Sequence, residues 1–139
     1  MRRFFVAAAM AVFVIAGVGG QGSDPGDLSQ YAGAQALYEL LTTAPDSVLL
    51  IDTRTPEEYE AGHIPGAVLI DYREIGDNPP TEDKDAPIIL YCRSGNRAGR
   101  AERTLRRLGY TNVFNWGGII DWPYEVVTGP EPGSFGDAE

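Results

Sequence analysis

The stretch PIILYCRSGNR, residues 87–97, decides the fold of this 139-residue chain. Its first five residues form an apolar run of the kind that builds a short buried strand, and helical spacing follows from about Gly95 to Leu108. The six residues from Cys92 to Arg97 are therefore predicted to form a strand-to-helix turn. The rest of the chain is interpreted as a support for this turn.

A turn of this kind is suited to hold an anion. Successive backbone N–H groups of a tight loop converge, and the first N–H groups of the helix are unsatisfied and carry the positive end of its dipole. Cys92 is the only cysteine of the chain and heads the turn. A thiol in this place, with arginines nearby, ionises readily to the nucleophilic thiolate. Cys92 is therefore the predicted nucleophile; the alternative is a small apolar side chain that fills the core at a strand end.

The arginines of the chain are concentrated after the cysteine. The formal net charge of −9 argues against nucleic acid as a partner. Six of the eleven basic residues nevertheless lie within residues 93–107, where Glu102 is the only acid. Arg93 and Arg97 lie inside the turn itself and are predicted to attract and orient a small anion. The arginines near the end of the helix are expected to form a solvated face.

Apolar runs that alternate with helical segments indicate an α/β domain with a mainly parallel sheet. The predicted helices cover residues 31–42 and 95–108, with single short turns near residues 55–60 and 119–124. The predicted strands are residues 48–51, 68–70, 87–91 and 111–115.

Two further polar groups are expected near the turn. The carboxyl ends of parallel strands meet at one edge of the sheet, so Asp52 and Arg54 are candidates for the rim of the same site. The alternative for Asp52 is that it holds its own loop by accepting backbone hydrogen bonds. His63 is the only histidine and is expected to fix a loop by hydrogen bonds, with a Cys-His catalytic pair as the alternative. One His and one Cys make a poor ligand set, so no metal site is predicted.

The first twenty residues have the layout of a secretory signal peptide. Arg2 and Arg3 are followed by fifteen uncharged residues and then by Gly19 and Gly20, after which we expect cleavage. The two arginines also allow a twin-arginine export route. The alternative is an uncleaved membrane anchor, but a segment that crosses a bilayer requires about 20 apolar residues, more than the fifteen found here. We therefore expect export to the periplasm or the extracellular space, where a single cysteine forms no internal disulfide.

The remainder of the chain is long enough for one domain. Residues 21–29 are predicted to be a flexible lead-in, residues 30–127 the domain, and residues 128–139, rich in glycine, proline and acids, a disordered tail. We expect a monomer.

Three separated motifs together resemble the single-domain rhodanese family, over residues 28–127. They are Asp52-Thr53-Arg54 followed by GHIPGA at 62–67, YCRSGNR at 91–97, and WGGI at 116–119 with Trp122. The resemblance implies a five-stranded, mainly parallel sheet flanked by helices on both faces, and a sulfurtransferase that needs no cofactor and no metal. Two departures matter little to the class: Ala98 stands where a serine is common, and Asp121 stands where a small residue is common.

The resemblance also implies a chemistry. Cys92 would alternate between a thiolate and a persulfide, in a cradle formed by Arg93, Ser94, Gly95, Asn96 and Arg97. A small anionic donor such as thiosulfate would supply the sulfur, and cyanide or a thiol would accept it. A protein that accepts the sulfur is a further expected partner.

Two other functions remain open at this point. Phosphatase or arsenate reductase chemistry also uses a cysteine loop, but only four residues separate Cys92 from Arg97, one fewer than in cysteine phosphatases. A loop of this length suits a sulfur atom better than a phosphate. The second is a persulfide carrier that serves a dedicated protein partner. A module that only binds is disfavoured, because inactive modules usually lack the cysteine.

Overall fold

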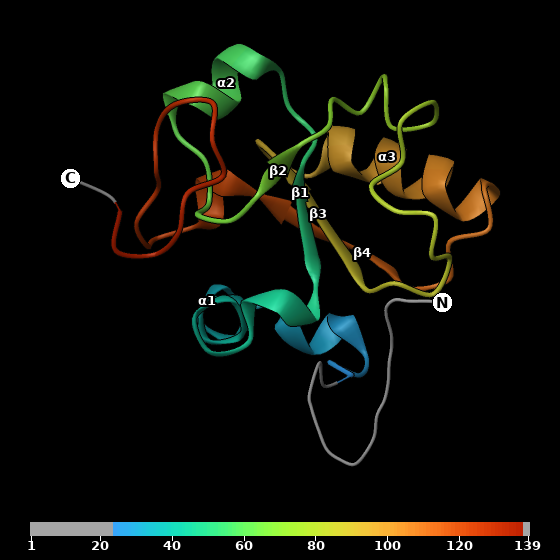
Figure 1. The fold of residues 1–139 in the computed structure, drawn as a ribbon, viewed down its shortest axis with the longest axis horizontal. Coiled ribbons are helices and arrows are strands. Elements are labelled where there is room, and N and C mark those ends of the chain that lie inside the picture. The colour runs from blue at the N-terminus through green and yellow to red at the C-terminus, as the bar shows by residue number, and fades with distance from the viewer. Residues whose placement is uncertain (1–23, 138–139) are drawn as a thin grey trace.

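The computed structural model describes residues 24–137, which form an α/β domain built on four parallel strands (Figure 1). The order across the sheet is β2-β1-β3-β4. Each predicted apolar run forms one strand. The family resemblance implied five strands, but the sheet within residues 24–137 has four, so this prediction was wrong in the number of strands. The strands are β1 (Leu49–Asp52), β2 (Val68–Leu69), β3 (Ile88–Cys92) and β4 (Val113–Gly118).

Three α-helices accompany these strands. They are α1 (Ala34–Thr43), which precedes β1, α2 (Pro56–Ala61), which lies between β1 and β2, and α3 (Asn96–Arg107), which lies between β3 and β4. Short 3-10 turns lie at Leu28–Tyr31, Pro45–Ser47 and Ile119–Asp121. Helix α1 begins later than predicted because Gly33 is its N-cap and the preceding residues form a separate 3-10 turn. Helix α2 is short but well capped, since Thr55 and Glu58 form a reciprocal capping box.

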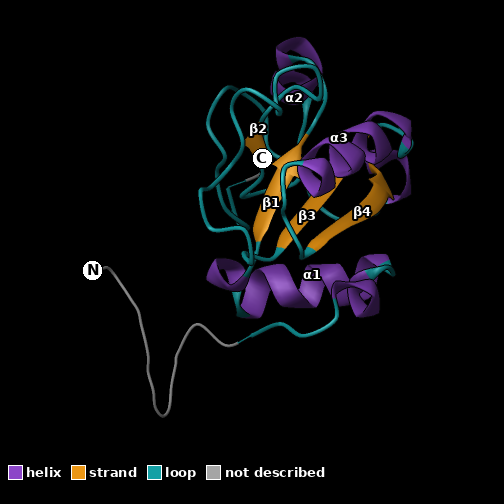
Figure 2. Cartoon of the chain, turned by 90° about the vertical axis from the view of Figure 1, so that its right-hand side faces the viewer, coloured by secondary structure: helices purple, strands orange, loops and turns teal. Residues whose placement is uncertain are grey.

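Strand β3 is buried along its whole length and divides the core into two layers. Ile89 and Tyr91 pack into the cluster that contains the leucines of α1. Leu90 and Cys92 alternate with them and pack into the cluster that contains Leu105 of α3. The two helices therefore cover different sides of the strands, as Figure 2 shows.

The C-terminal segment differs from the predicted disordered tail, because residues 128–137 lie against the domain. Val127 pairs with His63 in an isolated antiparallel bridge. Gly66 N–H donates a hydrogen bond to Pro132 O at 2.9 Å. The ring of Phe135 packs edge-on against Tyr38, with the centroids 5.3 Å apart. Proline and glycine in this segment shape a fixed path over the surface.

The predicted lead-in also differs in part. Leu28 is 3 % exposed and belongs to the core, so the packed domain begins before residue 30. The predicted signal peptide, residues 1–20, lies outside the described residues. Between residues 24 and 137, none of the helices has the length and apolar character needed to cross a membrane.

Candidate active site

The cysteine turn joins the end of β3 to the start of α3. Cys92 is the last residue of the strand and is 1 % exposed. The backbone N–H of Gly95 donates a hydrogen bond to Cys92 Sγ at 3.0 Å. Gly95 is the N-cap of α3 and has φ of +106°, a left-handed conformation that favours glycine. The predicted strand-to-helix turn is thus confirmed, and it directs a backbone donor at the sulfur.

Strand β4 and the turn after it pack against the backbone of the cysteine turn. A Cβ atom on Gly118 would overlap the backbone carbonyl of Arg93, so only glycine fits there. The Asn115 side chain donates to Gly95 O at 3.0 Å and accepts the N–H of Gly117 at 3.0 Å. Ile120 N–H donates to Arg93 O at 3.3 Å. These contacts fix the path of the turn around the sulfur.

The two arginines of the turn, predicted to act alike, have different environments. Arg93 is exposed. The guanidinium of Arg97 instead forms two hydrogen bonds to Glu58, Nη1 to Oε1 at 2.7 Å and Nη2 to Oε2 at 2.9 Å. This engagement removes the free guanidinium that a phosphate would need, so the geometry disfavours the phosphatase alternative.

The pair formed by Arg97 and Glu58 is electrostatically strong. Hydrogen bonds from Arg97 outweigh partial burial and lower the pKa of Glu58 to about 2. The pKa of Arg97 is raised, because its hydrogen bonds to Glu58 and the charge of that carboxylate outweigh burial, with smaller contributions from Cys92 and Asp52. The Arg97 cation therefore lies within electrostatic range of the thiolate while Glu58 holds it in place.

Asp52 and Arg54 form a buried clasp. Asp52 is fully buried and Arg54 is 6 % exposed, and the two ions are joined by Nη2 to Oδ2 at 2.7 Å and Nε to Oδ1 at 3.0 Å. Asp52 also accepts the backbone N–H of Arg54 at 2.9 Å, which is the loop-holding role predicted as its alternative. Arg54 further donates to Gly62 O at 2.7 Å. The clasp thus ties the end of β1 to the loop that begins at Gly62.

The clasp extends to a buried tyrosine. The hydroxyl of Tyr91 accepts the backbone N–H of Ile64 at 3.0 Å. Burial raises the pKa of Tyr91, and the charge of Asp52 raises it further, so the phenol stays protonated. On Arg54, burial opposes the charge, but the hydrogen bonds and charge of Asp52 outweigh it and the pKa is raised.

His63 fixes its loop, as predicted. Its Nδ1 lies 2.8 Å from Tyr59 O and its Nε2 lies 3.1 Å from Pro132 O. The ring is fully buried and stacks on Tyr59 with the centroids 3.6 Å apart. Because both ring nitrogens face backbone carbonyls, the arrangement does not support a catalytic pair with Cys92.

A groove of about 400 Å³ lies beside the cysteine turn. Arg54 follows β1, Arg93 follows β3, and Ile119 and Ile120 follow β4, so the carboxyl ends of three strands meet here as expected for a parallel sheet. Arg54 thus reaches the rim of the predicted site, whereas Asp52 does not line it. The remaining lining residues are Glu58, Ala61, Gly62 and Val126.

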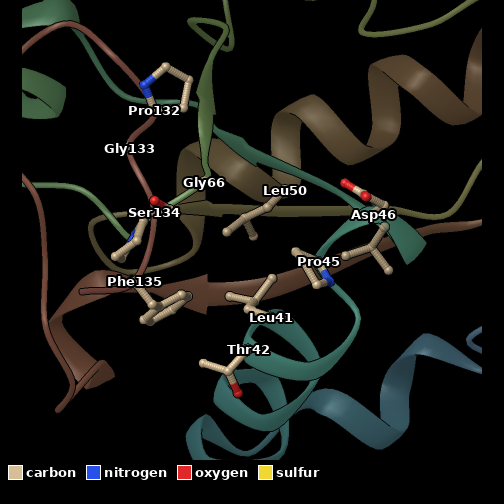
Figure 3. Close-up of a pocket in the computed structure, with 12 residues that line it drawn as sticks. Leu41, Thr42, Pro45, Asp46, Leu50, Gly66, Pro132, Gly133, Ser134 and Phe135 are labelled. Atoms are coloured by element: carbon tan, nitrogen blue, oxygen red, sulfur yellow. The ribbon is translucent and has the colours of Figure 1, made fainter. Parts of the chain in front are cut away.

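A larger hollow of about 480 Å³ lies elsewhere, between α1, the start of β1 and the C-terminal segment (Figure 3). Leu41, Leu50 and Phe135 are among its lining residues. None of the residues of the cysteine turn lines it. We therefore take the groove at Arg93 as the candidate site, because it is lined by charged side chains and adjoins the cysteine turn. Within residues 24–137, no three His, Cys, Asp or Glu side chains gather as a metal site would require.

Sequence reasoning did not identify Glu58 and Asn115 as parts of the site. Glu58 had a local signal, since a threonine three residues before a glutamate forms a capping box, but nothing local shows that the same carboxylate meets Arg97. Asn115 had no local signal. Its contacts join residues that are 20 positions apart in the chain.

Residues 33–123 match the model of the rhodanese-like domain. The chain is 37 % identical over 81 residues to "Thiosulfate sulfurtransferase PspE" of Escherichia coli, an alignment that covers 57 % of this chain and 78 % of that protein. It is 36 % identical over 78 residues to "Putative sulfur carrier protein YrkF" of Bacillus subtilis, covering 55 % of this chain and 42 % of that protein.

A solved structure shows the same fold. The rhodanese-like domain protein of Staphylococcus aureus superimposes with a TM-score of 0.61 at 28 % identity, covering 70 % of this chain and 95 % of that one. The matched segment contains the cysteine turn, the Asp52 and Arg54 clasp and the β4 support described above. This chain therefore belongs to the rhodanese-like domain family.

Proposed function

We propose that this protein is a sulfurtransferase that carries a sulfane sulfur as a persulfide on Cys92. The observation that carries the proposal is the hydrogen bond from Gly95 N–H to Cys92 Sγ at 3.0 Å, in a turn too short to enclose a phosphate. Its similarity to a thiosulfate sulfurtransferase supports the same assignment.

In the first half-reaction, the Cys92 thiolate attacks the outer sulfur of an anionic donor such as thiosulfate. A new S–S bond forms at Sγ, the bond between the two donor sulfurs breaks, and sulfite leaves with its electron pair. The exposed cation of Arg93 attracts the dianion, and the Arg97 cation offsets the negative charge at the sulfur.

In the second half-reaction, a nucleophile attacks the outer sulfur of the persulfide. With cyanide, a C–S bond forms, the Sγ–S bond breaks, and thiocyanate leaves. The electron pair returns to Cys92 as a thiolate, which accepts the hydrogen bond from Gly95 N–H. The chain's own residues perform both displacements, and neither step consumes an oxidant or a reductant.

The proposal is tested by thiocyanate formation from thiosulfate and cyanide. The wild-type protein is expected to turn over, and the Cys92→Ser variant is expected to lose turnover completely, because a hydroxyl does not carry the sulfur. Turnover retained by Cys92→Ser would place the nucleophile elsewhere. Thermal melting of both proteins checks that the variant is folded.

A second candidate is a persulfide carrier that receives its sulfur from a protein. The similarity to the protein named as a putative sulfur carrier favours it. The two functions differ in how Cys92 is loaded. A carrier would gain sulfur from a persulfidated protein donor and not from thiosulfate, whereas the sulfurtransferase gains it from thiosulfate directly.

Export is part of the proposal and rests on the basic and apolar pattern of residues 1–20. Expression of the full chain in a bacterium with a periplasm tests it. The expected product is a periplasmic protein whose N-terminal residue is Gln21. Full-length protein that stays in the cytoplasm would contradict export.

A further inference from the structure

The groove beside the cysteine turn has a wall that the thiosulfate reaction does not use. Ile119, Ile120 and Val126 line it together with the arginines of the site. Thiosulfate is a small, fully polar dianion and gains nothing from an apolar wall. The apolar wall therefore suits a second substrate that has apolar surface of its own.

The exposure of these side chains is unusual for this protein. Within the part of the chain that the structure describes, four large apolar side chains are exposed: Val68, Leu108, Ile120 at 59 % and Val126 at 37 %. Two of the four line this one groove. Exposed apolar surface that is gathered at a concave site recovers hydrophobic free energy when a ligand covers it.

The charges of the groove are almost fully neutralised. Arg54 is paired with Asp52 at 2.7 Å, and Glu58 is paired with Arg97 at 2.7 Å. Arg93 also lines the groove, is exposed, and has no acidic partner within 4.0 Å among residues 24–137. An occupant therefore meets an apolar wall and one unpaired cation.

We propose that this groove is the acceptor subsite and that it selects an organic thiol with an apolar body and a single anionic group. The proposal rests on the proposed function, because it needs a persulfide on Cys92. The apolar body of the acceptor covers Ile120 and Val126, and its anionic group lies near Arg93. Arg93 lines the groove and directly follows Cys92, so the groove adjoins the turn that carries the persulfide.

The transfer itself is balanced. The outer sulfur of the Cys92 persulfide takes a proton from solvent water. The acceptor thiolate then attacks this sulfur, so a new S–S bond forms and the Sγ–S bond breaks. The acceptor leaves as a hydropersulfide that keeps the proton. The electron pair of the broken bond stays on Cys92 as a thiolate.

The experiment preloads the protein with thiosulfate, removes excess donor, and measures sulfur transfer to a series of acceptors. The series is mercaptoacetate, 3-mercaptopropionate and 6-mercaptohexanoate, with 6-mercaptohexanol and 6-aminohexanethiol as charge variants. Each rate is divided by the concentration of the acceptor that is present as thiolate, so that differences in thiol acidity do not enter the comparison. We expect kcat/KM to rise about two- to fourfold for each methylene that the wall covers. Among the six-carbon thiols, we expect kcat/KM to be highest for the carboxylate, lower for the alcohol and lowest for the amine.

Two variants and one control make the test specific. Ile120→Ser is expected to weaken the rise of kcat/KM with chain length of the thiol. Its KM for 6-mercaptohexanoate should rise, while its KM for cyanide should not. Arg93→Gln is expected to abolish the preference for the carboxylate over the alcohol. Leu108→Ser removes another exposed apolar side chain, at the far end of α3, and is expected to change neither trend.

The outcomes separate this inference from the function on which it rests. A flat series in the wild-type protein, or a slope unchanged in Ile120→Ser, overturns the acceptor subsite while persulfide formation stays intact. A protein that forms no persulfide with thiosulfate overturns the proposed function, and the acceptor subsite fails with it.

Discussion

At the scale of single residues, the site depends on how Arg97 is held. Its guanidinium bonds both carboxylate oxygens of Glu58, and the same carboxylate accepts the backbone N–H of Thr55 at 3.1 Å. One carboxylate therefore caps α2 and orients a cation of the cysteine turn. Glu58 is a positioning residue, because it acts on the sulfur only through Arg97.

We predict that Glu58→Gln destabilises the protein by about 1 kcal/mol at neutral pH, a value reduced by solvent screening of this partly exposed pair. Folding lowers the pKa of Glu58 from 4.5 to about 2. The stability that the ionised pair contributes is therefore present above pH 4.5 and is lost as the pH falls toward 2. Urea unfolding of both proteins across this range measures the difference.

Glu102→Gln is the matched control for this prediction. Glu102 pairs with Arg106 on the surface of α3 at 3.1 Å, one turn apart. Its loss is expected to cost only about 0.3 kcal/mol. Equal losses in the two variants, or a Glu58→Gln difference that persists unchanged at pH 2, would show that the Arg97 pair has no special strength.

At the scale of elements, the cysteine turn rests on the glycine pair of β4. Gly118 has ordinary backbone angles, so its constraint is purely steric, because a side chain would meet Arg93 and Ser94. Gly117 has φ of +119° but open space at its Cβ position, so its constraint is purely conformational. The two glycines therefore separate crowding from backbone strain.

We predict that Gly118→Ala costs about 3 kcal/mol and slows persulfide formation, because the turn around Cys92 must move. Gly117→Ala is expected to cost about 1 kcal/mol, the usual cost of a side chain at positive φ. Denaturant unfolding gives both free energies, and the rate of persulfide formation reports on the turn. The prediction fails if the two variants are equally stable and equally active.

The elements that the sequence predicts well are those with continuous local patterns. The apolar runs of β1 and β3 and the helical spacing of α3 needed no distant contact to be recognised. Strand β4 was predicted to end at Asn115 but continues to Gly118. It continues because an irregularity in the pairing skips Trp116, so that Gly117 pairs with Tyr91. A bulge of this kind has no local signal.

At the scale of the whole molecule, the C-terminal segment closes the domain. Pro132 O meets the Nε2 of His63, and Phe135 packs near Tyr38 and Trp122. Composition alone predicted a disordered tail because glycine, proline and acids are frequent there. The contact between His63 and Pro132 joins residues 69 positions apart, and Phe135 lies still farther along the chain from Tyr38, so no local pattern reveals these contacts.

We predict that Phe135→Ala destabilises the domain by about 1–2 kcal/mol, because it removes an aromatic side chain that is only partly buried. Leu108→Ala is the control, since Leu108 is 41 % exposed and its loss is expected to cost less than about 0.5 kcal/mol. Thermal or urea unfolding compares them. A Phe135→Ala protein as stable as wild type would indicate that the segment does not contribute to the fold.

The same contrast holds for the site as a whole. The cysteine turn was predictable, because its strand, glycine and helix are consecutive in sequence. The meeting of strand ends and the place of Arg54 at the rim also followed from the parallel sheet. The pairing of Arg97 with Glu58 and the apolar lining of the groove did not, because they arise only when distant segments of the chain lie side by side. Sequence therefore predicts the reactive atom, and the fold supplies its surroundings.

Intact-mass measurement after incubation with thiosulfate shows whether Cys92 carries the transferred sulfur. The wild-type protein is expected to gain the mass of one sulfur atom, which cyanide then removes, and Cys92→Ser is expected to gain nothing. A wild-type protein that gains no sulfur, or a Cys92→Ser protein that gains as much as wild type, would show that Cys92 is not the sulfur carrier.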